Sequence, residues 1–163
     1  MIKLNLSLPI KNKVFKITNL LFFSKNKLIA IVKGTILIFL ISLVFAYIRS
    51  FIPIETNTNT EGINNRIDFN LFRIIMPLLF SPIIEELIFR KWIPDMFEDI
   101  LGRIKIVLLS NLLFSIFHLD IYFIPYLANG LIYSLYYENT KDIRVSIVIH
   151  VFYNMVVFLT TYY

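Results

Sequence analysis

The stretch Ser81-Pro82-Ile83-Ile84-Glu85-Glu86-Leu87-Ile88-Phe89-Arg90 places two adjacent glutamates and an arginine inside an apolar run. Further along the chain, His118, His150 and Asn154 interrupt two other apolar segments. Ionisable groups inside a bilayer cost roughly 2.5–3.5 kcal/mol each on insertion scales, so they indicate a functional site by default. Together these side chains supply carboxylates, imidazoles and an amide, which is a usable set for catalysis.

The overall composition is that of a membrane protein with one domain. Of the 163 residues 58% are hydrophobic, against roughly 45–50% in soluble domains. Cysteine is absent, which excludes disulfides, thiolate nucleophiles and thiolate metal ligands. The net charge is +5, and lysines crowd the amino-terminal end. This asymmetry favours a cytoplasmic anchor beside anionic lipid. We therefore expect a lipid bilayer as partner and no nucleic acid.

Five apolar regions predict an all-α fold, a polytopic transmembrane helix bundle of about five hydrophobic helices. Residues 1–27 are basic and predict an interfacial segment, 28–68 a first transmembrane helix with a polar external loop, and 69–163 a helical core that carries the polar motifs. Lys and Arg are frequent in 91–105 and 138–144, which the positive-inside rule places inside with the amino terminus. The expected location is the cell membrane, with multiple spans and a cytoplasmic amino terminus.

Local signals predict where the helix bearing the glutamates begins. Ser81 followed by Pro82 is typical of a helix start, with Ser81 as the N-cap. Glu85 and Glu86 would then lie in or near the first turn, where the helix dipole favours negative charge.

Helical spacing sorts the polar residues into pairs. Glu86 and Arg90 are four residues apart, so they share a helix face and can form an ion pair. The same spacing relates His150 to Asn154 on the last helix. Both pairs also have a purely structural interpretation, as a buried ion pair that fixes packing or as interhelical hydrogen bonding.

Gly102 is the expected turn of a helical hairpin. Glu85 lies 17 residues before it (102 − 85) and His118 lies 16 residues after it (118 − 102). Two antiparallel helices joined at Gly102 would therefore bring the two side chains to nearly the same height. Packing alone is a poor explanation for Glu85, His118 and His150 on three separate helices.

Three ordered motifs on separate apolar helices resemble those of the CPBP family of intramembrane proteases. They are Glu-Glu-x-x-x-Arg at 85–90, Phe-x-x-x-His at 114–118 and His-x-x-x-Asn at 150–154. That family includes the CAAX prenyl endopeptidases and the bacterial Abi and bacteriocin self-immunity proteins. The resemblance covers about residues 72–160 and implies that 69–163 is a catalytic core acting on a peptide or membrane-protein substrate.

The resemblance also implies roles for the polar residues. Glu85 would be the catalytic glutamate, and His118 would help it to activate water. His150 and Asn154 resemble the pair that stabilises the oxyanion. Such roles agree with general chemistry, because a carboxylate desolvated among helices is a better base and neutral donors stabilise charge that develops only in the transition state.

Glu86 and Arg90 would support the catalytic glutamate from the same helix. Glu85, His118 and His150 would also make a two-histidine, one-carboxylate zinc set with an open position for water. The resemblance equally supports metal-free glutamate catalysis. We favour an enzyme that requires no cofactor, with zinc as the alternative.

Three functions are compatible with this pattern. The first is an intramembrane endopeptidase, serving bacteriocin self-immunity or peptide processing. The second is a non-catalytic membrane immunity protein that sequesters a bacteriocin or its receptor. The third is a proton or ion pathway built from Glu85, Glu86 and the histidines, which ranks last because Asn154 has no role in a relay. The sequence determines neither the substrate nor the oligomeric state.

Overall fold

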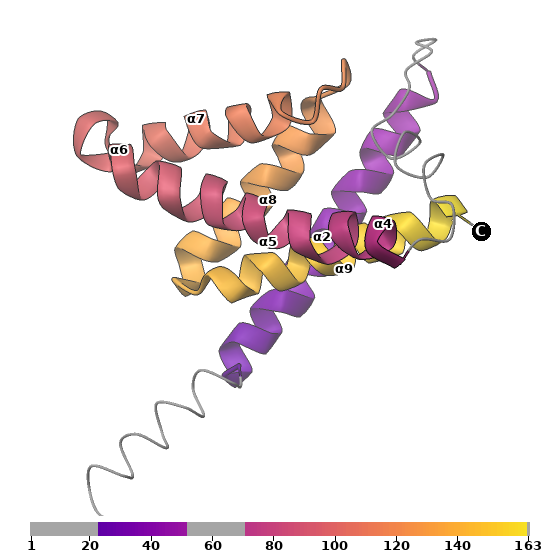
Figure 1. Cartoon of the computed structure of the whole chain (residues 1–163), viewed down its shortest axis with the longest axis horizontal. Coiled ribbons are helices and arrows are strands. Elements are labelled where there is room, and N and C mark those ends of the chain that lie inside the picture. Colours follow the sequence, from indigo (N-terminus) through magenta and orange to yellow (C-terminus); the bar gives the residue numbers. More distant parts are fainter. Residues whose placement is uncertain (1–22, 52–70, 163) are drawn as a thin grey trace, which may run out of the picture.

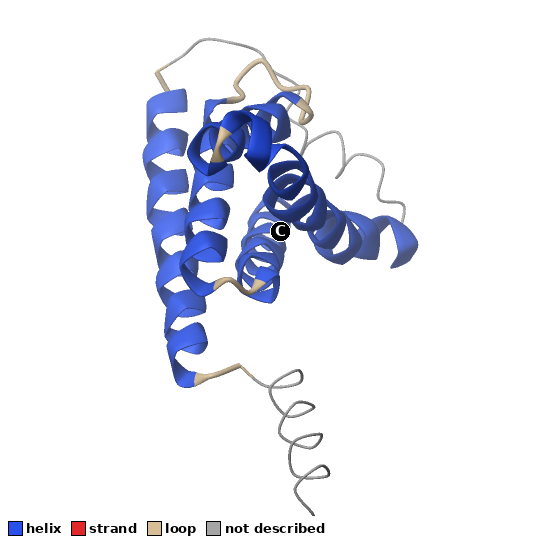
Figure 2. Cartoon of the chain, turned by 90° about the vertical axis from the view of Figure 1, so that its left-hand side faces the viewer, coloured by secondary structure: helices blue, strands red, loops and turns tan. Residues whose placement is uncertain are grey.

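Five helical segments make up the part of the chain that the computed structural model describes, residues 23–51 and 71–162 (Figures 1 and 2). They are α2 (Lys25–Arg49), a continuous helical rod over 71–101, α7 (Arg103–Ile116), α8 (Ile124–Thr140) and α9 (Ile143–Tyr162). Both described ranges are without strands. The predicted all-α helix bundle is therefore confirmed. Residues 1–22 and 52–70 lie outside the described residues, and with them most of the predicted interfacial segment and the polar loop.

The rod alternates between α-helix and the wider π-helix. Its segments in order are α4 (Leu71–Ile75), η1 (Met76–Phe80), α5 (Ser81–Glu86), η2 (Leu87–Trp92) and α6 (Ile93–Leu101). Gly102, with φ of +76°, ends the rod and lets α7 return antiparallel to α6 (Figure 1). The turn predicted at Gly102 is therefore present.

The helix start predicted at Ser81 is wrong. Ser81 has helical dihedrals (φ −57°, ψ −52°), and its N–H donates to the carbonyl of Met76, five residues earlier. Its hydroxyl donates to Oε1 of Glu85 and caps no helix. The physical reason is Pro82, whose ring and missing N–H disturb the preceding turn. The chain accommodates the proline by widening that turn into a π segment, so the helix continues.

The second π segment, η2, follows the same rule. Pro94 is the second residue of α6, and the N–H of Ile93 donates to the carbonyl of Ile88, again five residues earlier. In this register the next main-chain donor would belong to the proline, which has none. The carbonyl of Phe89 is therefore left without a main-chain donor. In η1 the same holds for the carbonyl of Pro77, because the residue five positions later is Pro82.

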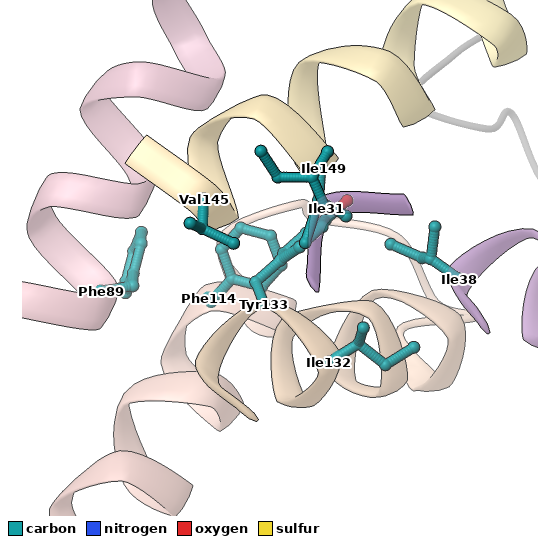
Figure 3. Close-up of a cluster of buried hydrophobic side chains, with 8 residues drawn as sticks. All are labelled: Ile31, Ile38, Phe89, Phe114, Ile132, Tyr133, Val145 and Ile149. Atoms are coloured by element: carbon teal, nitrogen blue, oxygen red, sulfur yellow. The ribbon is translucent and has the colours of Figure 1, made fainter. Parts of the chain in front are cut away.

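The helices meet in a core of buried apolar side chains to which all five segments contribute (Figure 3). Helix α2 packs on α8 and α9, and α7 packs on α8 and on the rod. The core members are Ile31, Ile38, Phe89, Phe114, Ile132, Tyr133, Val145 and Ile149. This core holds the faces of the rod, α7 and α9 that bear the polar motifs against one another.

The distribution of polarity differs from that of a soluble protein. Side chains buried in the bundle include the charged Glu86 and Arg90, whereas many large apolar side chains of α2 are exposed. Within the described ranges, two helices are long and apolar enough to cross a membrane, α2 and residues 143–160 of α9, yet only 17% and 22% of their most apolar windows are buried. A core helix of a soluble protein would be mostly buried, so these exposed apolar surfaces suit contact with lipid.

Ion pairs at one end of the bundle involve the start of α2, the start of α7 and the chain around the joint between α8 and α9. Lys27 of α2 contacts Asp142 at 2.7 Å, and Nε of Arg103 at the start of α7 donates to Glu138 of α8 at 2.9 Å. The hydrogen bond from Arg144, followed by that from Lys27, holds the pKa of Asp142 below its ordinary value against the effect of burial. These are the segments that the positive-inside rule places together. The side of the membrane that this end faces stays a prediction.

Gly34 allows α2 to approach α8 and α9 closely. A Cβ at this position would collide with Cδ1 of Ile149 and lie 3.1 Å from the ring of Tyr136. We expect Gly34→Leu to lower the free energy of unfolding by about 1–3 kcal/mol through overpacking. Thermal unfolding of the detergent-solubilised protein measures the effect. Val32→Leu, at an exposed position of the same helix, is the matched control, and equal losses in the two variants would contradict close packing at Gly34.

Candidate active site

Glu86 lies at the centre of the polar cluster and is fully buried. Its Oε1 lies 3.0 Å from Nδ1 of His150 on α9, and its Oε2 lies 3.3 Å from Nε of Arg90 one turn along the rod. The Arg90 contact is an ion contact without hydrogen-bond geometry. A carboxylate paired with a guanidinium is an acceptor, so Nδ1 of His150 carries the proton of this hydrogen bond. Glu86 thereby orients the imidazole, as a carboxylate orients the histidine in many hydrolases.

Arg90 is enclosed by the neighbouring helices. Its guanidinium carbon lies 4.3 Å from the ring centroid of Phe114 on α7 and 5.6 Å from that of Tyr133 on α8. Gly130 allows α8 to approach closely beside it, because a Cβ there would lie 2.7 Å from Oδ1 of Asn111 and 3.0 Å from Cδ1 of Phe114. Cation–π contact therefore replaces part of the hydration that a buried guanidinium loses.

Glu85 differs from its neighbour in its access to the surroundings. Its side chain is 25% exposed, whereas that of Glu86 is 0% exposed. Oε1 of Glu85 accepts the hydroxyl of Ser81, and Oε2 lies 3.8 Å from Nε2 of His150. His150 thus stands between the two glutamates, with one ring nitrogen facing each. Of the two carboxylates, only that of Glu85 can reach a water molecule or a substrate.

His118 lies two residues beyond the end of α7 and is half-buried. Its Nδ1 lies 2.8 Å from the carbonyl oxygen of Phe114, and since a carbonyl only accepts, Nδ1 carries the proton. In the neutral ring, Nε2 then holds the lone pair of a base. The ring stacks on Tyr126 of α8, with centroids 4.2 Å apart. The carboxylate of Glu85 interacts electrostatically with His118.

Asn154 lies one turn beyond His150 on α9. Its Nδ2 donates to the carbonyl of Pro77 at 3.2 Å, which is the carbonyl that η1 leaves without a main-chain donor. This contact uses one of the two N–H groups of the amide. The structure therefore ties Asn154 to the backbone just before the glutamates, and brings the other five predicted residues into the cluster itself.

Two tyrosines of α8 belong to the site and were not predicted. Tyr133 stacks on His150 with centroids 4.4 Å apart and an interplanar angle of 18°, and Tyr126 stacks on His118. These residues are seven apart, with Asn129 and Gly130 between them on one helix face. A stripe of small and polar residues within an apolar helix was the available signal. Elsewhere on α8, Ser134 accepts a buried hydrogen bond of 2.8 Å from Nδ2 of Asn111 on α7.

The zinc alternative requires three ligands that converge on one point. Across residues 23–51 and 71–162, no three histidine or carboxylate side chains are placed so that they could hold one metal ion. Glu85, His118 and His150 in this arrangement therefore do not fit zinc.

Known proteins resemble the chain over this same region. Residues 67–156 match the family model described as type II CAAX prenyl endopeptidase Rce1-like. The chain is 28% identical over 152 residues to the UPF0177 protein YbdI of Lactococcus lactis subsp. lactis (strain IL1403). This match covers 90% of the chain and 79% of YbdI. No solved structure matches the chain significantly.

Two relatives bear the names of peptidases. Over 83 residues the chain is 39% identical to the membrane-embedded CAAX protease MroQ of Staphylococcus aureus (strain USA300), covering 47% of this chain and 34% of MroQ. Over 97 residues it is 33% identical to the putative membrane peptidase YdiL of Bacillus subtilis (strain 168), covering 59% of this chain and 40% of YdiL. With the family model matched over more than half of its length, and all the clustered motifs inside that match, the chain belongs to the Rce1-like, type II CAAX prenyl endopeptidase family of membrane proteases.

Proposed function

We propose that this protein is an intramembrane endopeptidase. It would hydrolyse a peptide bond of a peptide or membrane-protein substrate with water activated by Glu85 and His118. The observation that supports it best is the difference between the adjacent glutamates. Glu86 is fully enclosed by Arg90 and His150, while Glu85 is partly exposed beside a histidine. One carboxylate is thus available for chemistry and the other for holding the site.

The proposed reaction begins with proton abstraction from water. Glu85 accepts a proton from a water molecule while the oxygen of that water attacks the scissile carbonyl carbon. His118 shares the role of base through Nε2. The attack forms the new C–O bond and leaves a tetrahedral oxyanion. Collapse of this intermediate breaks the C–N bond, and the proton held by the base passes to the leaving amine. Microscopic reversibility makes the same group act first as base and then as acid.

Two donors of α9 are proposed to stabilise the oxyanion. Asn154 has a second amide N–H beyond the one given to Pro77. His150, whose Nδ1–H is held by Glu86, would donate from Nε2 as an imidazolium, with both ring nitrogens protonated. Preorganised donors of this kind act on charge that develops only in the transition state.

His118→Ala tests the shared base role. We expect cleavage to fall by about 100-fold or more, because a positioned base contributes roughly 10²–10⁴-fold. Mass spectrometry of new amino termini in membranes from cells that express each variant measures cleavage of any substrate those membranes contain. Leu119→Ala, at the neighbouring exposed position, should behave as wild type. If His118→Ala also behaves as wild type, the proposed mechanism is wrong. In a bacteriocin-challenge assay, protection that survives this substitution would favour the non-catalytic immunity function.

Treatment with a strong zinc chelator tests the metal-free mechanism. Because the carboxylate and imidazole of Glu85 and His118 can activate water without a Lewis acid, we expect the purified protein to retain its cleavage rate after chelation and dialysis. The number of new amino termini per unit time is the measurement. Activity that is lost on chelation and restored by zinc would contradict this proposal and revive the two-histidine, one-carboxylate set.

A further inference from the structure

One backbone rule relates the carbonyls of Pro77 and Phe89. Each lies five residues before a proline in a π segment, so the donor that should reach it does not exist. Each accepts a side-chain hydrogen bond from another helix instead: Asn154 of α9 donates to Pro77 at 3.2 Å, and Ser110 of α7 donates to Phe89 at 2.5 Å. Along the chain, one acceptor precedes the stretch 85–88 and the other follows it.

Ser110 is fully buried and connects η2 to α7 at the level of the ion pair. Its acceptor, Phe89, directly precedes Arg90. One turn after Ser110 on the same helix comes Phe114, whose ring contacts the Arg90 guanidinium and whose carbonyl binds His118. A shift of η2 relative to α7 would therefore move both halves of the site.

We propose that Ser110 is a positioning residue of the active site, the counterpart on α7 of Asn154 on α9. The Ser110 hydroxyl replaces the N–H that Pro94 lacks, and the Asn154 amide replaces the N–H that Pro82 lacks. Together they hold the rod, with its two π segments, in one register against α7 and α9. A buried carbonyl without any donor is unfavourable, so each replacement favours this register over others. The effect on cleavage rests on the proposed peptidase function, whereas the hydrogen bond itself does not.

A double-mutant cycle tests the hydrogen bond directly. Pro94→Ala restores a main-chain N–H, so the carbonyl of Phe89 gains a donor whether η2 keeps the π register or reverts to α. We expect Ser110→Ala to lower the unfolding temperature of the full chain in detergent by several degrees in the wild-type background. In the Pro94→Ala background the same substitution should have a much smaller effect. Equal losses in the two backgrounds would overturn the proposal.

Cleavage provides the second readout. Ser110→Ala is expected to lower the yield of new amino termini by about tenfold, since small displacements of a site reduce rates strongly, and Pro94→Ala should restore part of that loss. Ser115→Ala is the matched control, because its buried hydroxyl donates within its own helix, to Leu112 at 2.8 Å. Identical yields for Ser110→Ala and Ser115→Ala would refute the positioning role. Absence of cleavage by the wild type would instead refute the peptidase function, and the unfolding cycle would still decide on the hydrogen bond.

Discussion

Replacement of Glu85 by glutamine is expected to abolish cleavage while the protein stays folded and inserted. The amide keeps the size of the carboxylate and can still contact the Ser81 hydroxyl, but it cannot accept a proton from water. A fall of at least about 1,000-fold is expected, within the range that general-base catalysis supplies. Mass spectrometry of new amino termini in membranes, compared between variant and wild type at matched expression, provides the measurement.

The control for this substitution is Glu98→Gln, which removes a carboxylate from the exposed end of the same rod. It should cleave like wild type, because the Glu98 carboxylate pairs with Arg103 near the hairpin turn. An unfolding temperature close to that of wild type would show that Glu85→Gln has not lost its fold. Full cleavage by a folded Glu85→Gln variant would remove Glu85 from the mechanism.

Replacement of Glu86 by methionine is expected to have the largest effect on stability. It leaves the Arg90 guanidinium buried without a counter-charge, and removal of one partner of a buried ion pair costs about 3–5 kcal/mol. The double variant Glu86→Met/Arg90→Met buries two apolar side chains of similar length, so it should recover most of that loss. It should nevertheless remain inactive, because Nδ1 of His150 has lost its acceptor.

The exposed pair Lys91–Asp95, also four residues apart, is the matched control. Lys91→Met should change the free energy of unfolding by about 0–1 kcal/mol, as is usual for exposed ion pairs. Thermal unfolding in detergent and the yield of new amino termini report the two effects separately. A double variant that cleaves at the wild-type rate would reduce Glu86 and Arg90 to packing residues. One that is as unstable as Glu86→Met would show that charge burial is not the cause.

Much of the site followed from helical spacing. The four-residue separation of Glu86 and Arg90 predicted their contact, and the hairpin count around Gly102 predicted that Glu85 approaches His118. Both predictions depend only on the rise and period of a helix and on one glycine with positive φ. The contacts of Tyr133 and Ser110 could not be predicted in this way, because they depend on how far α7 and α8 slide and rotate against the rod.

The error at Ser81 has the same origin. A serine before a proline is typical of a helix start, and local propensity cannot distinguish a start from a widened turn inside a longer helix. Asn154 and Ser110, distant in sequence, supply the donors that the prolines lack, and these donors compensate the widened turns. The outcome therefore depends on partners that only the assembled bundle provides.

By itself, the sequence determined the all-α fold, the membrane environment and the polar side chains available for the proposed chemistry, because these follow from hydropathy, from helical period and from the high energy of charges in lipid. Only the tertiary structure determined which glutamate is accessible and which is enclosed. Adjacent residues on a helix point about 100° apart, so the packing of α9 and α7 against the rod places Glu86 inside the bundle and leaves Glu85 partly exposed. That difference assigns one carboxylate to the proposed chemistry and the other to its support.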